Sequence, residues 1–99
     1  MPASNEAITS CTSLPAVLDQ RTIEPARDVL ASALERGDLV IDASAVERLS
    51  TVGVHLLLSA ERTAREKGVG FAIERPSAPF LETLSALGLE SRFAPWIRA

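Results

Sequence analysis

One stretch, residues 39–58, constrains the fold of this chain more than any other. It opens with three β-rich apolar residues at 39–41, and the run ends at Asp42. Apolar runs of this kind are typical of strands that are covered on both faces, as in a parallel sheet. After a polar turn, apolar side chains recur at steps of three and four residues, the period of an amphipathic helix. The stretch therefore predicts a buried strand that leads into a helix.

Predicted strands and helices alternate on both sides of that stretch. Upstream, residues 14–18 predict a strand, and residues 22–37 predict a helix with one apolar face. Downstream, residues 71–73 predict a strand and residues 77–88 a third helix, and residues 93–97 predict a short closing strand that packs back on the core. Alternation on this scale is typical of α/β folds.

We therefore expect an α/β fold with a small single-layer, mixed, largely parallel sheet and three or four helices. The strand at residues 39–41 should be the most buried, with residues 14–18 and 71–73 as its neighbours in the sheet. With 99 residues, 46% of them hydrophobic, the chain has the size of one globular domain. Its expected organisation is an N-terminal tail with a possible edge strand at residues 1–12 and the folded domain at residues 13–99.

Charge and targeting signals narrow the class of protein further. The net charge is −3, with acidic and basic residues interspersed, so the sequence predicts no surface for nucleic acid or membrane. The N-terminal region has neither the basic start nor the apolar core of a secretory signal, and no apolar run approaches the roughly 20 residues of a membrane-spanning helix. We expect a cytoplasmic protein without direct membrane insertion. Its single cysteine, Cys11, excludes an internal disulfide and is expected to be a small, unreactive apolar residue of the weak edge strand.

Two hydroxyl residues, Ser50 and Thr51, stand where the predicted strand and turn lead into the helix. Either can cap that helix, a contribution of about 1 kcal/mol. The same position has unpaired backbone N–H groups and the positive end of the helix dipole, which favour a phosphate. Gly53 lowers helix propensity by up to ~1 kcal/mol relative to alanine. It should therefore allow a close approach, either by a neighbouring strand or loop or by a partner's backbone.

Few residues are candidates for catalysis or metal binding. Asp19 and Asp42 both follow predicted strands, which suits a metal or an acid–base pair, although helix capping or loop hydrogen bonding is the favoured role for each. His55, the single histidine, lies four residues after Thr51 on the same helix face, but a third member of a catalytic group is not identifiable. The sequence therefore predicts no catalytic residue, no metal ligand and no cofactor, and hence a protein that is not an enzyme.

The residues around this junction resemble the signature of the STAS family, the anti-sigma-factor antagonists and their relatives. Members have an apolar strand, an aspartate, a short loop, and then Asp-Ser/Thr-x-Gly at the start of a helix; here the segment reads LVIDASAVERLSTVGVHLLL. Thr51 falls on the family's phosphoacceptor and Gly53 on its glycine, while Ser50 stands where most members have aspartate. Downstream, KGVGFAIERPSAPFLETLSALGL resembles the family's Gly-strand-x-Pro-Ser-helix-Gly-Leu pattern, and Leu18 with Asp19 resembles the Leu-Asp before its first helix.

The resemblance implies a STAS-like fold and a non-catalytic, phospho-regulated protein-interaction module in signalling and transcription regulation. Thr51 would be the phosphoacceptor, with Ser50 as the alternative acceptor. The unphosphorylated form would bind an anti-sigma factor or a kinase-like regulator, and phosphorylation would release it. The partner would contact the residues on and around the junction: Asp19, Glu47, Arg48, Ser50, Thr51, Val52 and Gly53.

Two other roles are open for a short STAS protein. One is an accessory subunit of a membrane transporter, bound to its cytoplasmic ATPase; a threonine at the acceptor position occurs among such proteins, as Thr51 does here. The other is an adaptor in chemotaxis or two-component signalling. Serine in place of the family's aspartate at position 50 weakens the case for phosphorylation, because an aspartate beside the acceptor could influence its recognition by a kinase. It leaves the predicted docking surface unchanged.

Overall fold

The apolar run at residues 39–41 lies in strand β3 (Leu39–Asp42), an inner strand of a four-stranded sheet. The structure, a computed structural model, describes residues 11–98. Leu39 and Ile41 are completely buried and Val40 is 5% exposed, so β3 is the most buried of the described strands, as its sequence predicted. Continuous burial of this kind follows from a strand that has sheet neighbours on both edges and packed layers over its side chains.

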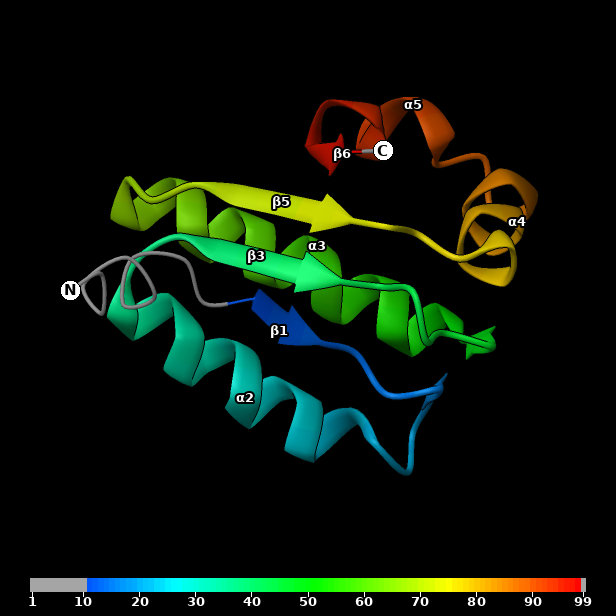
Figure 1. The fold of residues 1–99 in the computed structure, drawn as a ribbon, viewed down its shortest axis with the longest axis horizontal. Coiled ribbons are helices and arrows are strands. Elements are labelled where there is room, and N and C mark those ends of the chain that lie inside the picture. The colour runs from blue at the N-terminus through cyan, green and yellow to red at the C-terminus, as the bar shows by residue number, and fades with distance from the viewer. Residues whose placement is uncertain (1–10, 99) are drawn as a thin grey trace, which may run out of the picture.

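The sheet is parallel throughout the described residues, which confirms the expected α/β fold with a largely parallel sheet (Figure 1). Its order is β1–β3–β5–β6, in which β1 is Cys11–Ser13, β5 is Phe71–Glu74 and β6 is Ile97–Arg98. One predicted neighbour of β3 is therefore correct, because β5 contains residues 71–73. The β3–β5 register places Ile41 opposite Ile73, and both side chains are completely buried.

The other predicted neighbour is wrong, because residues 14–18 do not pair with β3. The strand beside β3 is β1, and it ends at Ser13 opposite Asp42. The Leu14 N–H still donates to the Asp42 carbonyl at 3.0 Å, but Pro15 has no N–H with which to continue the ladder. The chain turns away there, and β2 (Val17–Leu18) pairs instead with β4 (Arg48–Leu49) in a separate two-stranded parallel sheet.

The edge strand that the sequence placed before residue 13 is represented by β1, which lies at one edge of the four-stranded sheet. Residues 6–10 of that prediction lie outside the described residues. Cys11 lies in this edge strand, as expected, and its side chain is exposed, while Thr12, one residue on, is 8% exposed and faces inward. Because neighbouring side chains of a strand point to opposite faces, only one of the two can be buried against the helices. Partial desolvation of the thiol by its neighbours, together with the nearby Asp42 and Glu74 carboxylates, raises the pKa of Cys11.

Two long helices, α2 (Ile23–Arg36) and α3 (Thr51–Lys67), pack side by side along the sheet (Figure 1). Their buried residues recur at steps of three and four, in agreement with the predicted apolar stripes. No helix within residues 11–98 is long and apolar enough to cross a membrane. The completely buried large side chains come from α3, from the helices that follow it and from the strands and loops around them: Leu18, Leu39, Ile41, Val46, Val54, Leu57, Ile73, Phe80, Leu84 and Phe93.

The C-terminal part closes one end of the molecule through α4 (Ala78–Ala86), α5 (Glu90–Phe93), the 3-10 turn η1 (Ala94–Trp96) and the short strand β6 (Figure 1). The sequence predicted a strand over residues 93–97, but the strand begins only at Ile97, because Phe93 ends α5 and Pro95 lies in η1. The expectation that this segment packs back on the core is confirmed. Phe93 is completely buried, and the Trp96 ring meets the rings of Phe71 and Phe93 edge to face, with centroid distances of 5.5 and 5.1 Å.

Candidate functional site

The start of α3 is attached to β2 through Ser50. The Ser50 hydroxyl accepts a hydrogen bond from the Gly53 N–H at 3.3 Å, which makes Ser50 the N-cap of α3. The same hydroxyl donates to the Leu18 carbonyl at 3.0 Å, and the Ser50 N–H donates to that carbonyl at 3.0 Å as well. The capping role predicted for Ser50 is confirmed, and its hydroxyl is already used as both donor and acceptor.

Thr51, in contrast, is exposed at the first residue of α3. Within residues 11–98, no hydrogen bond occupies its hydroxyl. A hollow of about 670 Å³ lies beside it, which we call the Thr51 hollow. The hollow is open at the positive end of the α3 dipole, where backbone N–H groups lack helical partners. Its lining residues come from the turn before α2 and the first turns of α3: Asp19, Gln20, Arg21, Ser50, Thr51, Val52 and His55.

Gly53 allows α3 to begin directly against β2. A Cβ atom at this position would lie 2.9 Å from the Leu18 Cγ, 2.9 Å from the Leu49 Cδ1 and 3.0 Å from the Leu18 carbonyl oxygen. The neighbour that requires this glycine is therefore a strand of the same chain, one of the two alternatives that the sequence left open. Gly53 is buried, so it adds no exposed surface next to Thr51. Gly53 would therefore contribute to partner binding only indirectly, by allowing the neighbouring residues at the start of α3 to lie close to β2.

We expect Gly53→Ala to lower the free energy of unfolding by about 1–3 kcal/mol, the usual range for overpacking a well-filled site. The higher helix propensity of alanine, worth up to ~1 kcal/mol, offsets only part of this loss, because the Leu18 carbonyl belongs to the backbone and cannot move aside freely. Thermal unfolding followed by circular dichroism measures the effect. Ser59→Ala is the matched control, since Ser59 is an exposed residue of the same helix. A melting temperature of Gly53→Ala equal to or above that of the control would contradict the close approach.

The two aspartates that the sequence singled out both form local turns. The Asp19 Oδ1 accepts a hydrogen bond from the Arg21 N–H at 2.9 Å, and the Asp42 Oδ1 accepts one from the Ser44 N–H at 2.8 Å. Loop hydrogen bonding was the favoured role for each, and it is confirmed. Asp42 also forms an ion pair with Arg75, and hydrogen bonds from Arg75 and Ser44 hold the pKa of the Asp42 carboxyl well below its ordinary value.

Asp19 and Asp42 do not form a pair, because only Asp19 lines the Thr51 hollow. Among residues 11–98, no three His, Cys, Asp or Glu side chains are grouped so that they could hold a metal ion. His55 is exposed and lines the Thr51 hollow, as its position one turn after Thr51 predicted. No hydrogen bond joins the His55 ring to the Thr51 hydroxyl within the described residues.

The remaining predicted contact residues divide into two groups. Val52 is half-buried and lines the Thr51 hollow. Glu47 and Arg48 are exposed but do not line it; their backbone N–H groups both donate to the Ala16 carbonyl, at 2.7 and 3.0 Å. They therefore lie at and just before the start of β4, outside the lining of the hollow.

Two lining residues, Gln20 and Arg21, are not among the contact residues predicted from the sequence. The available signal was their position directly after Asp19, in the turn that leads into α2. Such a turn lies at the same edge as the start of α3 when β2 and β4 are parallel neighbours. Without the pairing of β2 with β4, the sequence gives no reason to place Gln20 and Arg21 beside Thr51.

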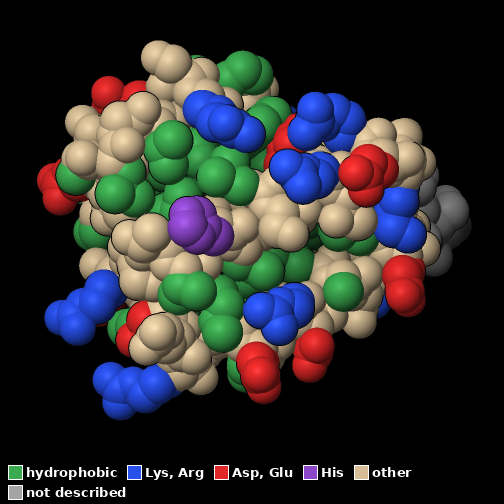
Figure 2. Space-filling model, turned by 180° about the vertical axis from the view of Figure 1, so that it is seen from behind, with side chains coloured by type: hydrophobic (Ala, Val, Ile, Leu, Met, Phe, Trp, Pro, Cys, Tyr) green, Lys and Arg blue, Asp and Glu red, His purple; other side chains and the backbone are tan. Residues whose placement is uncertain are grey.

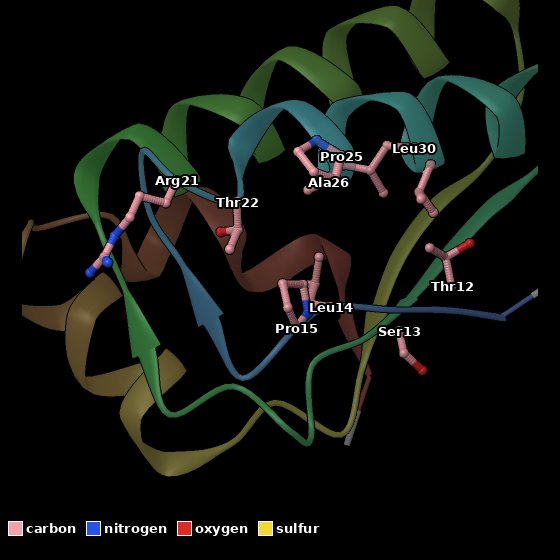
Figure 3. Close-up of a pocket in the computed structure, with 10 residues that line it drawn as sticks. Thr12, Ser13, Leu14, Pro15, Arg21, Thr22, Pro25, Ala26 and Leu30 are labelled. Carbon is pink, nitrogen blue, oxygen red and sulfur yellow. The ribbon is translucent and has the colours of Figure 1, made fainter.

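A second cavity, of about 450 Å³, lies between the segment after β1 and the first half of α2 (Figure 3). Figure 3 shows Leu14 and Pro15 facing Pro25 and Ala26 across it, while the Arg21 side chain points away. The Thr22 hydroxyl at its border is used within the turn, because it donates to the Val17 carbonyl at 2.9 Å and accepts from the Asp19 N–H at 3.0 Å. The lining is mostly apolar and offers no set of groups for catalysis.

The fold and the strand-to-helix junction together define a class of protein. The family model described as "Mlab, STAS domain" matches residues 7–97, nearly the whole chain. The chain therefore belongs to the STAS-domain family, which confirms the resemblance seen in the sequence.

Among solved structures, the fold is similar to that of the anti-sigma factor antagonist SpoIIAA in its unphosphorylated form. The two structures superpose with a TM-score of 0.72 at 19% sequence identity, and the match covers 93% of this chain and 79% of that one. At this identity the similarity shows a shared fold. A comparison with curated proteins gives no match.

Proposed function

We propose that this protein is a non-catalytic docking module of the cytoplasm whose binding to a partner protein is controlled by phosphorylation of Thr51. The observation that carries the proposal is the exposed, unoccupied hydroxyl of Thr51 at the first residue of α3, beside the Thr51 hollow. An acceptor for a kinase must be reachable by the active site of another protein. Thr51 meets that requirement, and the family to which the chain belongs supports a regulatory role for this position.

The electrostatics at Thr51 suit a switch that changes the surface and leaves the fold intact. A phosphate adds about −1.5 to −2 charges and three strong hydrogen-bond acceptors. The N-terminus of α3 stabilises such a charge through its free N–H groups and its dipole. Meanwhile Ser50 and Gly53 hold α3 against β2 by contacts that do not involve the Thr51 hydroxyl. A partner that covers this surface would have to desolvate the phosphate, and its affinity would fall.

Between the two hydroxyl residues, Thr51 is the better acceptor. Phosphorylation of Ser50 would disrupt the cap of α3 and the hydrogen bond to the Leu18 carbonyl at once. Most family members have aspartate in place of Ser50. A carboxylate could accept the hydrogen bond from the Gly53 N–H, but when ionised it could not donate to the Leu18 carbonyl. Serine at this position therefore strengthens the attachment of α3 and weakens the case for a second acceptor.

The partner that we propose is an anti-sigma factor or a kinase-like regulator, which would bind the unphosphorylated form and release it on phosphorylation. A transporter ATPase is the second candidate. It is favoured by one observation, the threonine at position 51, because a threonine acceptor occurs among short STAS accessory subunits. A chemotaxis or two-component adaptor would use the same surface. Genes next to the one encoding this chain would separate these roles: a regulator with an ATPase domain of the histidine-kinase type, or genes for a transporter.

The test begins with affinity capture of the partner from an extract of the native cells and its identification by mass spectrometry. The captured protein is then titrated with wild-type chain and with Thr51 variants. A partner whose affinity depends on the charge at position 51 supports the proposal. A partner whose affinity is unchanged by that charge contradicts it.

We predict that the purified chain hydrolyses ester and phosphoester substrates no faster than buffer. The Thr51 hydroxyl and the His55 ring share a hollow, but no hydrogen bond joins them and no third group orients the ring within the described residues. Release of p-nitrophenol from p-nitrophenyl acetate and p-nitrophenyl phosphate measures the activity, and His55→Ala is the control. Turnover that is above background in the wild type and lost in His55→Ala would contradict a non-catalytic protein.

A further inference from the structure

Another hollow, of about 260 Å³ and separate from the apolar cavity of Figure 3, lies on the same side of α3 as the Thr51 hollow. Its walls carry three arginines, Arg62 and Arg65 from α3 and Arg92 from α5, and we call it the arginine hollow. His55 lines both hollows, so the two are neighbours along the helix. Figure 2 shows this face with the histidine in purple and Lys or Arg side chains on several sides of it, with acidic side chains among them.

The arginine hollow is positively charged although the chain as a whole is negative. Three guanidinium groups face one carboxylate, that of Glu61, so that +3 and −1 leave a net charge of +2 in a chain whose formal net charge is −3. Glu61 forms an ion pair with Arg65 at 3.3 Å. Among residues 11–98, the other ion pairs join Arg75 to Asp42 and Arg98 to Glu74, so Arg62 and Arg92 have no acidic partner.

The sequence spacing places these groups on one line with the proposed acceptor. Positions 51, 55, 58, 62 and 65 follow one another at steps of four, three, four and three, which is one face of a helix. At 1.5 Å per residue, the distance along α3 from Thr51 to Arg62 is about 17 Å. A partner that buries about 800 Å² of this protein, the usual area for a stable complex, would cover both hollows.

We propose that the arginine hollow binds an acidic segment of the partner protein that docks at Thr51. This inference rests on the proposed function and specifies the chemistry of the partner. Guanidinium groups bind carboxylates through two parallel hydrogen bonds, and unpaired Arg62 and Arg92 converge from two different elements to offer such bonds. Leu58 is half-buried in the lining of the hollow and offers an apolar contact for the stem of a glutamate or aspartate.

An acidic peptide suits this surface better than a nucleic acid does. Binding along a nucleic-acid backbone requires basic groups that follow many phosphates, and the negative net charge of this chain opposes that approach. The positive charge here is confined to one hollow. A short run of carboxylates matches its charge.

The experiment uses the full chain and a synthetic hexaglutamate peptide, with hexalysine as the control peptide. Titration is followed by the NMR shifts of the amide and guanidinium groups, at low and at physiological salt. We expect hexaglutamate to shift the signals of Arg62, Arg65 and Arg92, and binding to weaken at the higher salt concentration. Arg62→Glu/Arg92→Glu should weaken binding of the peptide by at least roughly tenfold, since it replaces two attractive charges with two repulsive ones.

Two controls separate a specific site from a general charge effect. Arg27→Glu/Arg36→Glu changes the net charge by the same amount on α2, outside both hollows, and should leave peptide binding within about twofold of wild type. Arg62→Gln/Arg92→Gln removes the charges without reversing them and should give an intermediate affinity. All of these positions are exposed, and unchanged circular dichroism spectra will show that the variants fold.

The outcomes distinguish this inference from the proposed function. The proposed binding of an acidic segment would be overturned if the α2 variant lost as much peptide binding as Arg62→Glu/Arg92→Glu, or if the wild type did not bind hexaglutamate. Binding of phosphatidylglycerol vesicles that depends on the arginines, without binding of the peptide, would also overturn the inference. The surface would then contact a membrane. Thr51→Glu should bind hexaglutamate as the wild type does, at most about twofold weaker, since its charge lies about 17 Å away along α3. A partner that is released by arginine reversal but not by Thr51→Glu supports the hollow and contradicts the switch.

Discussion

Ile41→Asp should abolish the folded state. The Ile41 side chain is completely buried in β3, between Thr12 of β1 and Ile73 of β5. The substitution removes the packing of a core isoleucine, which costs about 2–5 kcal/mol, and buries a carboxyl group without a partner, which costs several kcal/mol more. The total is comparable to the roughly 5–15 kcal/mol by which a domain of this kind is stable. We therefore expect a chain with no cooperative thermal transition.

The measurement is thermal unfolding by circular dichroism, together with the yield of soluble protein. Val29→Asp is the matched control, because Val29 is also a β-branched residue but lies on α2 with 49% of its surface exposed. The control should melt within a few degrees of wild type, since surface substitutions usually change stability by less than about 0.5 kcal/mol. A soluble Ile41→Asp protein with the melting temperature of wild type would mean that β3 is not the centre of the core.

Thr51→Glu should weaken binding of the partner strongly while leaving stability almost unchanged. The new carboxylate lies at the positive end of the α3 dipole, an interaction that contributes about 0.3–1 kcal/mol in favour of the folded state. Ser50 remains the cap of α3, so the substitution removes no hydrogen bond from the helix start. In the complex, by contrast, the charge must lose its water, and an unpaired buried charge costs several kcal/mol. We expect an affinity at least roughly a hundredfold lower than that of wild type.

Thr51→Ala is the control for the loss of the hydroxyl, because it removes the acceptor without adding charge. It should bind the partner nearly as well as wild type and should not respond to the kinase. Isothermal titration of the three forms against the captured partner gives the affinities, and their melting temperatures are measured alongside. Equal affinities of Thr51→Glu and wild type would place the docking surface elsewhere and leave Thr51 as an ordinary first residue of a helix.

Local features of the fold could be predicted from the sequence, because local patterns determine them. The burial of β3 follows from three successive apolar residues, and the extents of α2 and α3 follow from their apolar stripes and terminal glycines. The neighbour of β3 on the N-terminal side could not be predicted in this way. Pro15 indicates where a ladder must stop, but the pairing of β2 with β4 joins segments about thirty residues apart, and no local pattern records such a contact.

The candidate site shows the same division. The sequence identified Ser50 and Thr51 but could not separate a cap from an acceptor, because that depends on the Leu18 carbonyl, which only the folded chain brings within 3.0 Å of the Ser50 hydroxyl. For Gly53 it left two causes open, and the contact with Leu18 and Leu49 decides between them. No sequence pattern indicates that Arg92 approaches Arg62, because α5 and α3 are brought together only by tertiary packing.

The shared use of Leu18 has a consequence for the kinetics of association. The Leu18 carbonyl accepts two hydrogen bonds from Ser50, and its side chain is completely buried, with its Cγ close to Gly53. The first turn of α3 is therefore held in place before any partner arrives. A preorganised surface loses little conformational entropy when a complex forms. Association with a partner should then follow a single bimolecular step whose rate rises linearly with concentration, without the plateau that a prior rearrangement of this chain would impose.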